Sequence, residues 1–306
     1  MPYLRLLRPT QWIKNFFVFA GLVFSGQLLQ LASLYTTLLA FACMCLVSSA
    51  VYVINDLHDR EEDKLHPRKC NRPIAAGLVS VPAAVAMAGG LIVLGIGGGW
   101  ILHHGFGVIV IAYFVLQILY TFGFKHAVIL DVIAIGLGFV LRAVAGVVVL
   151  DVELSRWLVL CTFTLCLFMG FSKRRCELNA LAANNGSKAA VKHRKTLAVY
   201  TPELLNHMTT LTAGVAIVCF MLYTIDARTI KVFGEFGAKA LLFTLPIVVY
   251  AIFRFAVLVE HGEVDGPTDV VTRDRPFQIA LVLWVLSALL IIYKQDMIQS
   301  LLGTLK

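Results

Sequence analysis

The chain has 306 residues, of which 59% are apolar and only 14% charged, and its formal net charge is +8. A water-soluble domain carries roughly 25% charged residues, so this composition excludes a soluble protein and indicates one that is embedded in a membrane. The seven cysteines include no C-x-x-C pair, which argues against a disulfide framework or a thiolate metal site.

Nine apolar runs are long enough to cross about 30 Å of hydrocarbon as helices, which takes roughly 20 residues each. In chain order they lie at about 13–30, 35–55, 82–102, 105–122, 128–150, 156–172, 205–225, 237–258 and 277–297. Several connections are very short, which favours antiparallel neighbours in one bundle. We therefore predict an all-α, multi-pass membrane bundle of about nine transmembrane helices that forms a single domain over residues 1–306.

The basic residues indicate how the bundle is oriented. The opening residues, "MPYLRLLRPTQWIKN", lack the layout of a cleaved signal peptide, so the N-terminus is expected to be retained. If it lies inside, most of the 26 lysines and arginines fall in inner segments, as the positive-inside rule requires. We expect a protein of the cell (inner) membrane with its N-terminus and active site facing the cytoplasm. Membrane lipid and phosphorylated substrates are then expected partners, and nucleic acid is not.

The second apolar run leads into an unusually charged stretch, "NDLHDREEDKLHPRKCNRPIAAG", residues 55–77. If its helix continues for two turns, Asp56, Asp59 and Asp63 share one face, whereas Glu61 points away. Like charges at a membrane boundary are costly unless a cation neutralises them, although a solvated helix end balanced by nearby bases is the simpler alternative. Carboxylates beside Asn55, without clustered His or Cys, suit Mg²⁺ shared with substrate phosphates.

Three bases follow the acidic residues directly and are candidate phosphate ligands: Arg68, Lys69 and Arg72. Arginine binds phosphate as a bidentate fork, while simple anchoring at the inner membrane face is the alternative explanation. Acidic and basic residues together predict a site for a magnesium diphosphate.

The pattern N-D-x-x-D-x-x-x-D, followed by "HPRKCNRPIAAG", resembles the first aspartate-rich motif of the UbiA superfamily of intramembrane prenyltransferases. A nine-helix count is also that family's, and the similarity runs over essentially the whole chain. The resemblance implies that Asp56, Asp59 and Asp63 are catalytic residues that bind Mg²⁺ and the diphosphate of the donor.

The segment after the sixth apolar run departs from the superfamily, whose typical members carry a second aspartate-rich motif there. Here residues 171–200 hold one acid, Glu177, among seven bases. The stretches at 7–15, 120–132 and 172–178 resemble the decaprenyl-phosphate phosphoribosyltransferase branch of the superfamily. This resemblance implies that the lipid is the acceptor, and that phosphoribosyl diphosphate, the soluble donor, occupies the aspartate site.

Further candidate substrate contacts lie near the ends of other apolar runs, or within one in the case of Arg142: Lys14, Tyr120, Lys125, Arg142, Lys173, Arg174, Arg175 and Glu177. An arginine as deep as Arg142 should face the bundle interior, paired with a carboxylate or awaiting a phosphate, and Asp131 shares its helix face. For the remaining residues, interface anchoring or a solvated charge run is the simpler explanation.

The leading hypothesis is a Mg²⁺-dependent pentosyltransferase that moves 5-phosphoribose from phosphoribosyl diphosphate to a polyprenyl phosphate. The acceptor phosphate is already an anion and needs no general base, so one displacement with inversion at the anomeric carbon is expected. Two alternatives stay open. One is a prenyltransferase that donates an isoprenoid diphosphate to an aromatic acceptor, and the other is a non-catalytic lipid binder or transporter.

Overall fold

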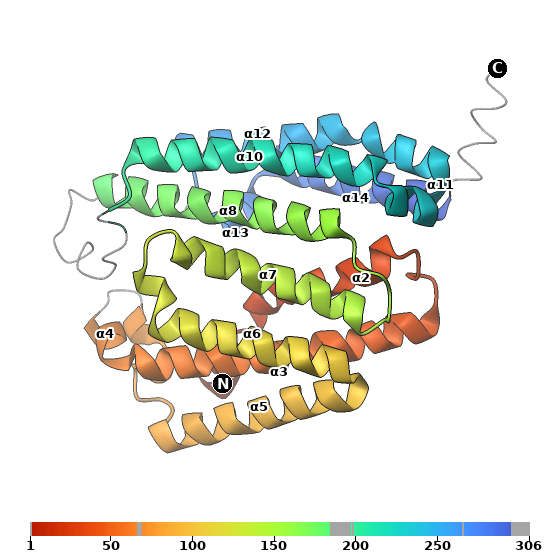
Figure 1. Ribbon diagram of the computed structural model, residues 1–306. Helices are drawn as coiled ribbons and strands as arrows, with labels where there is room; N and C mark the ends of the chain where they lie inside the picture. The colour runs from red at the N-terminus through yellow and green to blue at the C-terminus, as the bar shows by residue number, and fades with distance from the viewer. Residues whose placement is uncertain (1, 66–68, 184–196, 198, 265, 295–306) are drawn as a thin grey trace. The chain divides into compact units, whose positions relative to one another are not determined.

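The computed structural model describes residues 2–65, 69–183, 197, 199–264 and 266–294. All of its regular elements are helices, and the described residues contain no strand, which confirms the all-α fold class. The chain divides into two compact units (Figure 1). Unit 1 holds Met1–Phe124 and Gly138–Leu154, and unit 2 holds Lys125–Leu137 and Ser155–Lys306. The single-domain organisation stays a prediction.

Unit 1 contains the acidic stretch and the elements around it. These are α1 (Pro2–Leu7), η1 (Pro9–Val18), α2 (Phe19–Phe24), α3 (Leu31–His58), α4 (Arg60–Leu65), η2 (Lys69–Asn71), α5 (Val81–Leu102), α6 (His104–Phe122) and the second part of α7 (Leu130–Val148); the short η3 (Phe124–His126) follows α6. Helices α3, α5 and α6 pack against one another (Figure 1). A core between α3, α6 and α7 includes Met44, Val47, Phe106, Val110 and Ala145, all fully buried.

Unit 2 is built mainly from the long helices of the second half of the chain. They are α8 (Arg156–Ala183), α10 (Pro202–Ile225), α11 (Ala227–Leu242), α12 (Leu245–Glu260), α13 (Pro267–Arg273) and α14 (Arg275–Tyr293). Helix α10 packs along α8, and α12 packs against α14 and α8. Buried Phe168, Cys176, Phe255, Leu258 and Val270 form a core that holds α8, α12 and α13 together.

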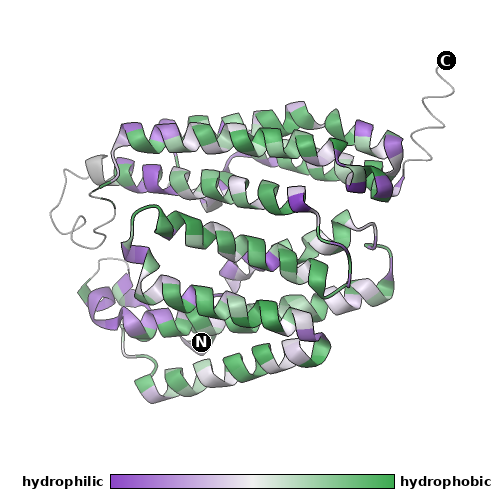
Figure 2. Ribbon diagram, in the orientation of Figure 1, coloured by the Kyte–Doolittle hydropathy of each residue, from purple (hydrophilic) through white to green (hydrophobic). Residues whose placement is uncertain are grey.

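The long helices have the length and composition of membrane spans. Over the described residues seven helices qualify, or eight if the bent pair α11 and α12 is one span, so the count of nine is not confirmed. That pair bends by 56° at the break between the two helices. Pro246 lies in the first turn of α12, where it cannot donate the backbone hydrogen bond that would continue α11. Figure 2 shows hydrophobic helix middles, with hydrophilic residues gathered at places such as α4.

The apolar run expected as a helix over residues 13–30 is instead split between η1 and the six-residue α2. Two glycines let this segment approach α7 at backbone distance. A Cβ added to Gly146 would overlap the carbonyl oxygen of Val18, and one added to Gly21 would lie 2.5 Å from the backbone of Gly146. The close approach, rather than helix propensity, positions η1 within unit 1.

Helix α8 is longer than the sequence predicted. The run expected to end at residue 172 continues as helix to Ala183. Residues 172–183 contain no Gly or Pro and are rich in Ala, Leu, Lys and Arg, which favour a helix. The basic stretch at 172–178 therefore lies on a helix and not in a loop.

Candidate functional site

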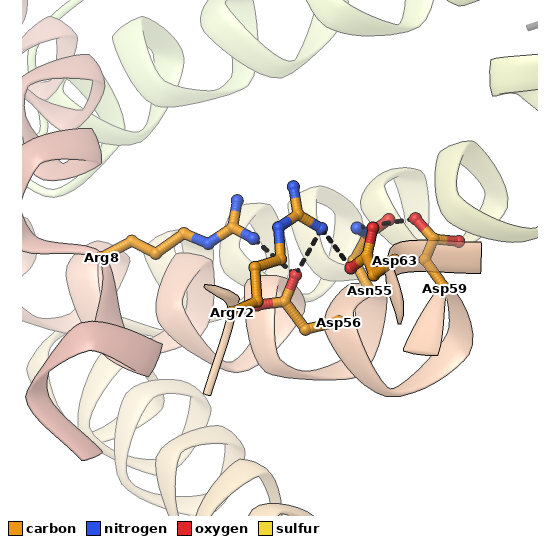
Figure 3. A network of polar contacts seen from close by, with 6 residues as sticks. All are labelled: Arg8, Asn55, Asp56, Asp59, Asp63 and Arg72. Carbon is orange, nitrogen blue, oxygen red and sulfur yellow. Dashed lines mark hydrogen bonds and ion pairs between the residues drawn. The ribbon is translucent and has the colours of Figure 1, made fainter. Parts of the chain in front are cut away.

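The acidic residues of unit 1 lie where α3 gives way to α4. The expected continuous helix is interrupted, because α3 ends at His58 and Asp59 is its C-cap. The spacing of a helix nevertheless persists, since Asp59 N donates to Asn55 O and Asp63 N donates to Asp59 O at 2.9 and 2.8 Å. The break therefore leaves Asn55, Asp59 and Asp63 close together (Figure 3).

Two arginines neutralise the carboxylates (Figure 3). Arg72 Nη1 donates to Asp56 Oδ1 at 3.0 Å and to Asp63 Oδ2 at 2.7 Å, and Arg8 Nη2 donates to the same Asp56 oxygen at 2.5 Å. Asp56 and Asp63 are each only 2% exposed, so the solvated helix end is not what the structure shows for them. A buried carboxylate is tolerated when it is paired and hydrogen-bonded.

The outward-facing acid of this stretch behaves as predicted. Glu61 has a side chain 74% exposed and pairs with Lys64 at 2.8 Å. It makes no contact with the arginine that pairs with Asp56 and Asp63. The charged residues at 56–64 therefore form two sets: buried Asp56 and Asp63, and the exposed pair Glu61 and Lys64.

The donor set suits Mg²⁺. A single arginine nitrogen contacts one oxygen each of Asp56 and Asp63, so a single cation can reach both carboxylates. Asp59 lies beside them and accepts from Asn55 Nδ2 at 3.1 Å. Among the described residues no three His, Cys, Asp or Glu side chains form a metal cage. Mg²⁺ commonly takes one or two carboxylates and completes its shell with water and substrate phosphate, so two converging acids are sufficient.

Arg8 is a member of the cluster that sequence reasoning missed. It lies at the start of η1 with a left-handed backbone conformation, φ 50°, and its guanidinium lies over the ring of Tyr52 at 5.0 Å. A hydrogen bond from Ser49 Oγ to the Leu7 carbonyl oxygen, 2.8 Å long, ties this turn to α3. The basic residue before Pro9 was the available signal, but its partner Asp56 is 48 residues away.

Arg142 faces the interior of unit 1, as predicted, but its partners are neutral. Its Nε donates to Asn15 Oδ1 at 2.8 Å, its Nη1 to the Gly138 carbonyl at 2.9 Å and its Nη2 to the Tyr113 hydroxyl at 2.7 Å. Arg142 is 5% exposed, and its guanidinium also lies over the Tyr113 ring at 4.6 Å. Arg142 thus fastens η1, α6 and α7 to one another.

Asp131, which was expected to share a helix face with Arg142, belongs to a separate cluster in unit 2. Its Oδ2 lies 3.6 Å from Nε of Arg174, which is fully buried and whose Nη1 donates to Glu177 at 2.6 Å. The Tyr200 hydroxyl donates to Asp131 Oδ1 at 3.0 Å. Burial raises the pKa of Tyr200 to about 12, so it stays a neutral donor at ordinary pH.

The other predicted residues are more dispersed. Lys69 and Lys173 are exposed, and Arg175 lies 3.2 Å from Glu260. The half-buried ones are Lys14, Tyr120 and Lys125. Arg68 lies outside the described residues. The structure therefore brings together Asp56, Asp63 and Arg72 in unit 1, and Arg174 with Glu177 in unit 2.

Sequence comparison supplies the family. A profile of the UbiA prenyltransferase family matches residues 15–282. The chain belongs to the UbiA prenyltransferase family. Together with its apolar helices, this membership makes the protein an integral membrane protein, and it confirms the superfamily resemblance of the N-D-x-x-D-x-x-x-D stretch.

Three relatives share the same name. The decaprenyl-phosphate phosphoribosyltransferase of Mycolicibacterium smegmatis is 35% identical, with 92% of this chain and 89% of the relative covered. That of Corynebacterium glutamicum is 33% identical, covering 96% and 87%, and that of Mycobacterium tuberculosis is 34% identical, covering 92% and 91%. The chain therefore matches these relatives over nearly their whole length.

Solved structures share the fold. A UbiA homologue from Archaeoglobus fulgidus bound to DMAPP and Mg²⁺ superposes with a TM-score of 0.70 at 20% identity, covering 95% of this chain and 99% of that one. The same homologue bound to GPP and Mg²⁺ gives the same values. The chain therefore adopts the UbiA fold, in which this homologue was solved with Mg²⁺ bound.

Proposed function

We propose that this protein transfers 5-phosphoribose from phosphoribosyl diphosphate to a polyprenyl phosphate and releases diphosphate. The observation that carries the proposal is the 33–35% identity, over nearly the full length, to three decaprenyl-phosphate phosphoribosyltransferases. The buried acidic cluster of unit 1 supports it, because carboxylates flanked by arginines suit a ligand that brings Mg²⁺ and phosphate together.

In this account Asp56, Asp63 and Asp59 would hold Mg²⁺, which would supply positive charge to stabilise the leaving diphosphate. Asn55 orients Asp59 through its hydrogen bond of 3.1 Å, and Arg72 lies close enough to the same carboxylates to contact the diphosphate as well. The Mg²⁺-bound UbiA structures support the metal by analogy of fold.

The reaction itself needs little proton chemistry. An oxygen of the lipid phosphate forms a bond to C1 of the ribose while the bond from C1 to the diphosphate oxygen breaks. The attacking oxygen is already anionic, so none of the aspartates has to act as a base. Attack from the face opposite the leaving group inverts the anomeric carbon, as in inverting glycosyl transfer.

The remaining predicted contacts are proposed to bind the two phosphorylated substrates: Lys14, Arg68, Lys69, Tyr120, Lys125, Arg142, Lys173, Arg174, Arg175 and Glu177. Arg174 is the least suited of the cations, because Asp131 and Glu177 already neutralise it in a fully buried position. We also place the acidic cluster on the cytoplasmic side, in agreement with the distribution of lysines and arginines.

The first test is reconstitution with site variants. Purified protein in detergent receives phosphoribosyl diphosphate, polyprenyl phosphate and Mg²⁺, and mass spectrometry follows the phosphoribosyl lipid. The wild-type protein should form this lipid, and Asp56→Asn should slow its formation by roughly a hundredfold or more. Asn has nearly the same shape as Asp, so thermal unfolding in detergent should still be cooperative.

Glu61→Gln is the matched control, because it removes an acid of the same segment that is exposed and away from Arg72. It should leave the rate within about twofold, as expected for surface substitutions. Near-normal turnover in Asp56→Asn, or equal loss in both variants, would refute the assigned role of Asp56.

A further inference from the structure

The acidic cluster of unit 1 already holds cations of its own. Arg72 Nη1 lies within hydrogen-bond distance of Asp56 and Asp63 at the same time, and Arg8 contacts the Asp56 oxygen that Arg72 uses. The positive charges of Arg8 and Arg72 thus balance the negative charges of Asp56 and Asp63, while the neighbouring Asp59 accepts a hydrogen bond from Asn55. A metal ion shared by Asp56 and Asp63 would have to lie where the Arg72 nitrogen now lies (Figure 3).

The arginines are also the accessible members of the cluster. The side chains of Arg8 and Arg72 are each 24% exposed, whereas those of Asp56 and Asp63 are each 2% exposed. An anionic ligand that arrives from solvent can therefore reach the guanidinium groups, while the carboxylates are shielded. Arg72 follows the short turn η2, and Arg8 precedes η1, so neither guanidinium is held inside a long helix.

Charge balance makes either ligand unfavourable by itself. A divalent cation bound alone would either lie next to two arginines or drive both of them off their partners, and like charges at such short range repel strongly in a poorly solvated site. A diphosphate bound alone would draw the arginines away and leave two buried carboxylates unpaired, which is also costly.

We propose that Arg72 and Arg8 exchange partners when Mg²⁺ and diphosphate arrive together, and that this exchange makes the binding of the two ligands mutually dependent. The arginines leave Asp56 and Asp63 and pair with the diphosphate oxygens, and the freed carboxylates become metal ligands. The proposal rests on the proposed function only in requiring a diphosphate ligand, and it adds that the arginine-paired carboxylates resist Mg²⁺ alone.

The test measures two affinities by isothermal titration calorimetry on the full-length protein in detergent. One titrant is Mg²⁺ alone, and the other is inorganic diphosphate in the presence of excess Mg²⁺. Removing a resident cation with Arg72→Gln should tighten the binding of Mg²⁺ alone by about tenfold or more and weaken the binding of magnesium diphosphate by a similar factor. Opposite shifts are the signature, because a merely structural arginine would weaken both.

Two further variants complete the experiment. Arg8→Gln leaves the contacts of Arg72 with Asp56 and Asp63 in place. It should also tighten the binding of Mg²⁺ alone and weaken the binding of magnesium diphosphate, so it tests the proposal if Arg72→Gln does not fold. Lys64→Gln removes a nearby cation that pairs with exposed Glu61 and should change neither affinity.

Weaker binding of both titrants in the arginine variants, or unchanged affinity for Mg²⁺ alone, would overturn the exchange. Opposite shifts in a protein that transfers no phosphoribose would refute the proposed function and leave the exchange standing, because the titrations use no donor sugar.

Discussion

Asp56 shows how a single carboxylate is accommodated in an apolar bundle. It is almost fully buried, and one of its oxygens accepts from both Arg8 and Arg72. Breaking a buried ion pair typically costs about 3–5 kcal/mol, because the remaining charge is left without a partner. The same two arginines compensate the buried charge and are the groups proposed to exchange partners, so stability and the proposed chemistry depend on the same contacts.

Arg142 offers a test at the scale of one residue. Its three hydrogen bonds to Asn15, Gly138 and Tyr113 need the planar fork of a guanidinium, which lysine cannot reproduce. Arg142→Lys keeps the charge but leaves buried acceptors unpaired, so it should lower the free energy of unfolding by about 2 kcal/mol. Thermal unfolding in detergent measures this. An unchanged melting temperature with a raised KM for the lipid phosphate would instead make Arg142 a substrate contact alone.

Site residues could be predicted from the sequence where they all lie in one short segment. Asp56, Asp59, Asp63 and Arg72 lie within a single stretch, and their acidic and basic character already indicated a metal and phosphate site. Arg8 could not be found in this way, because only the tertiary fold brings it to a carboxylate 48 residues away. For the same reason, Asp131 was compared with Arg142 on its own helix, whereas its partners come from α8 and from Tyr200.

Among the elements, the contact between η1 and α7 makes the sharpest prediction. A methyl group at position 146 would collide with the Val18 carbonyl oxygen, so Gly146→Ala should destabilise the protein by about 1–3 kcal/mol. Gly89→Ala is the control, because an added Cβ at that position in α5 meets no atom within 4 Å and alanine favours the helix. The melting temperature in detergent should therefore fall for Gly146→Ala and stay equal or rise for Gly89→Ala. The opposite order would contradict the close approach.

The positions of the long helices could be predicted from hydropathy, but the residues at which several of them begin or end could not. Long apolar runs such as α3 and α5 were expected close to where they lie, because roughly 20 apolar residues have few other stable conformations in a membrane. The run at 13–30 was expected as one helix, whereas tertiary contact through Gly146 accompanies a 3-10 segment there. Helix α8 continued past its apolar part, since hydropathy marks where a membrane ends and not where a helix does.

At the scale of the whole molecule, a single family match covers residues of both units. The family match at residues 15–282 includes the carboxylates and Arg72 of the acidic cluster in unit 1, and the buried Arg174 cluster of unit 2. The fold class could be predicted from composition together with the lengths of the apolar runs. The branch of the family was predicted from the stretches at 7–15, 120–132 and 172–178, together with the bases that residues 171–200 carry where a second acidic motif was expected.

The central claim is that the diphosphate donor is a sugar and the lipid is the acceptor. Parallel reactions with purified protein and Mg²⁺ test it most directly: one contains ribose-labelled phosphoribosyl diphosphate with polyprenyl phosphate, and the other contains labelled polyprenyl diphosphate with an aromatic acceptor. We expect ribose label in the lipid extract, in an amount equal to the diphosphate released, and no prenylated aromatic product. Label on the aromatic acceptor would contradict the claim in favour of a prenyltransferase, and no transfer in either reaction would favour a lipid binder or transporter.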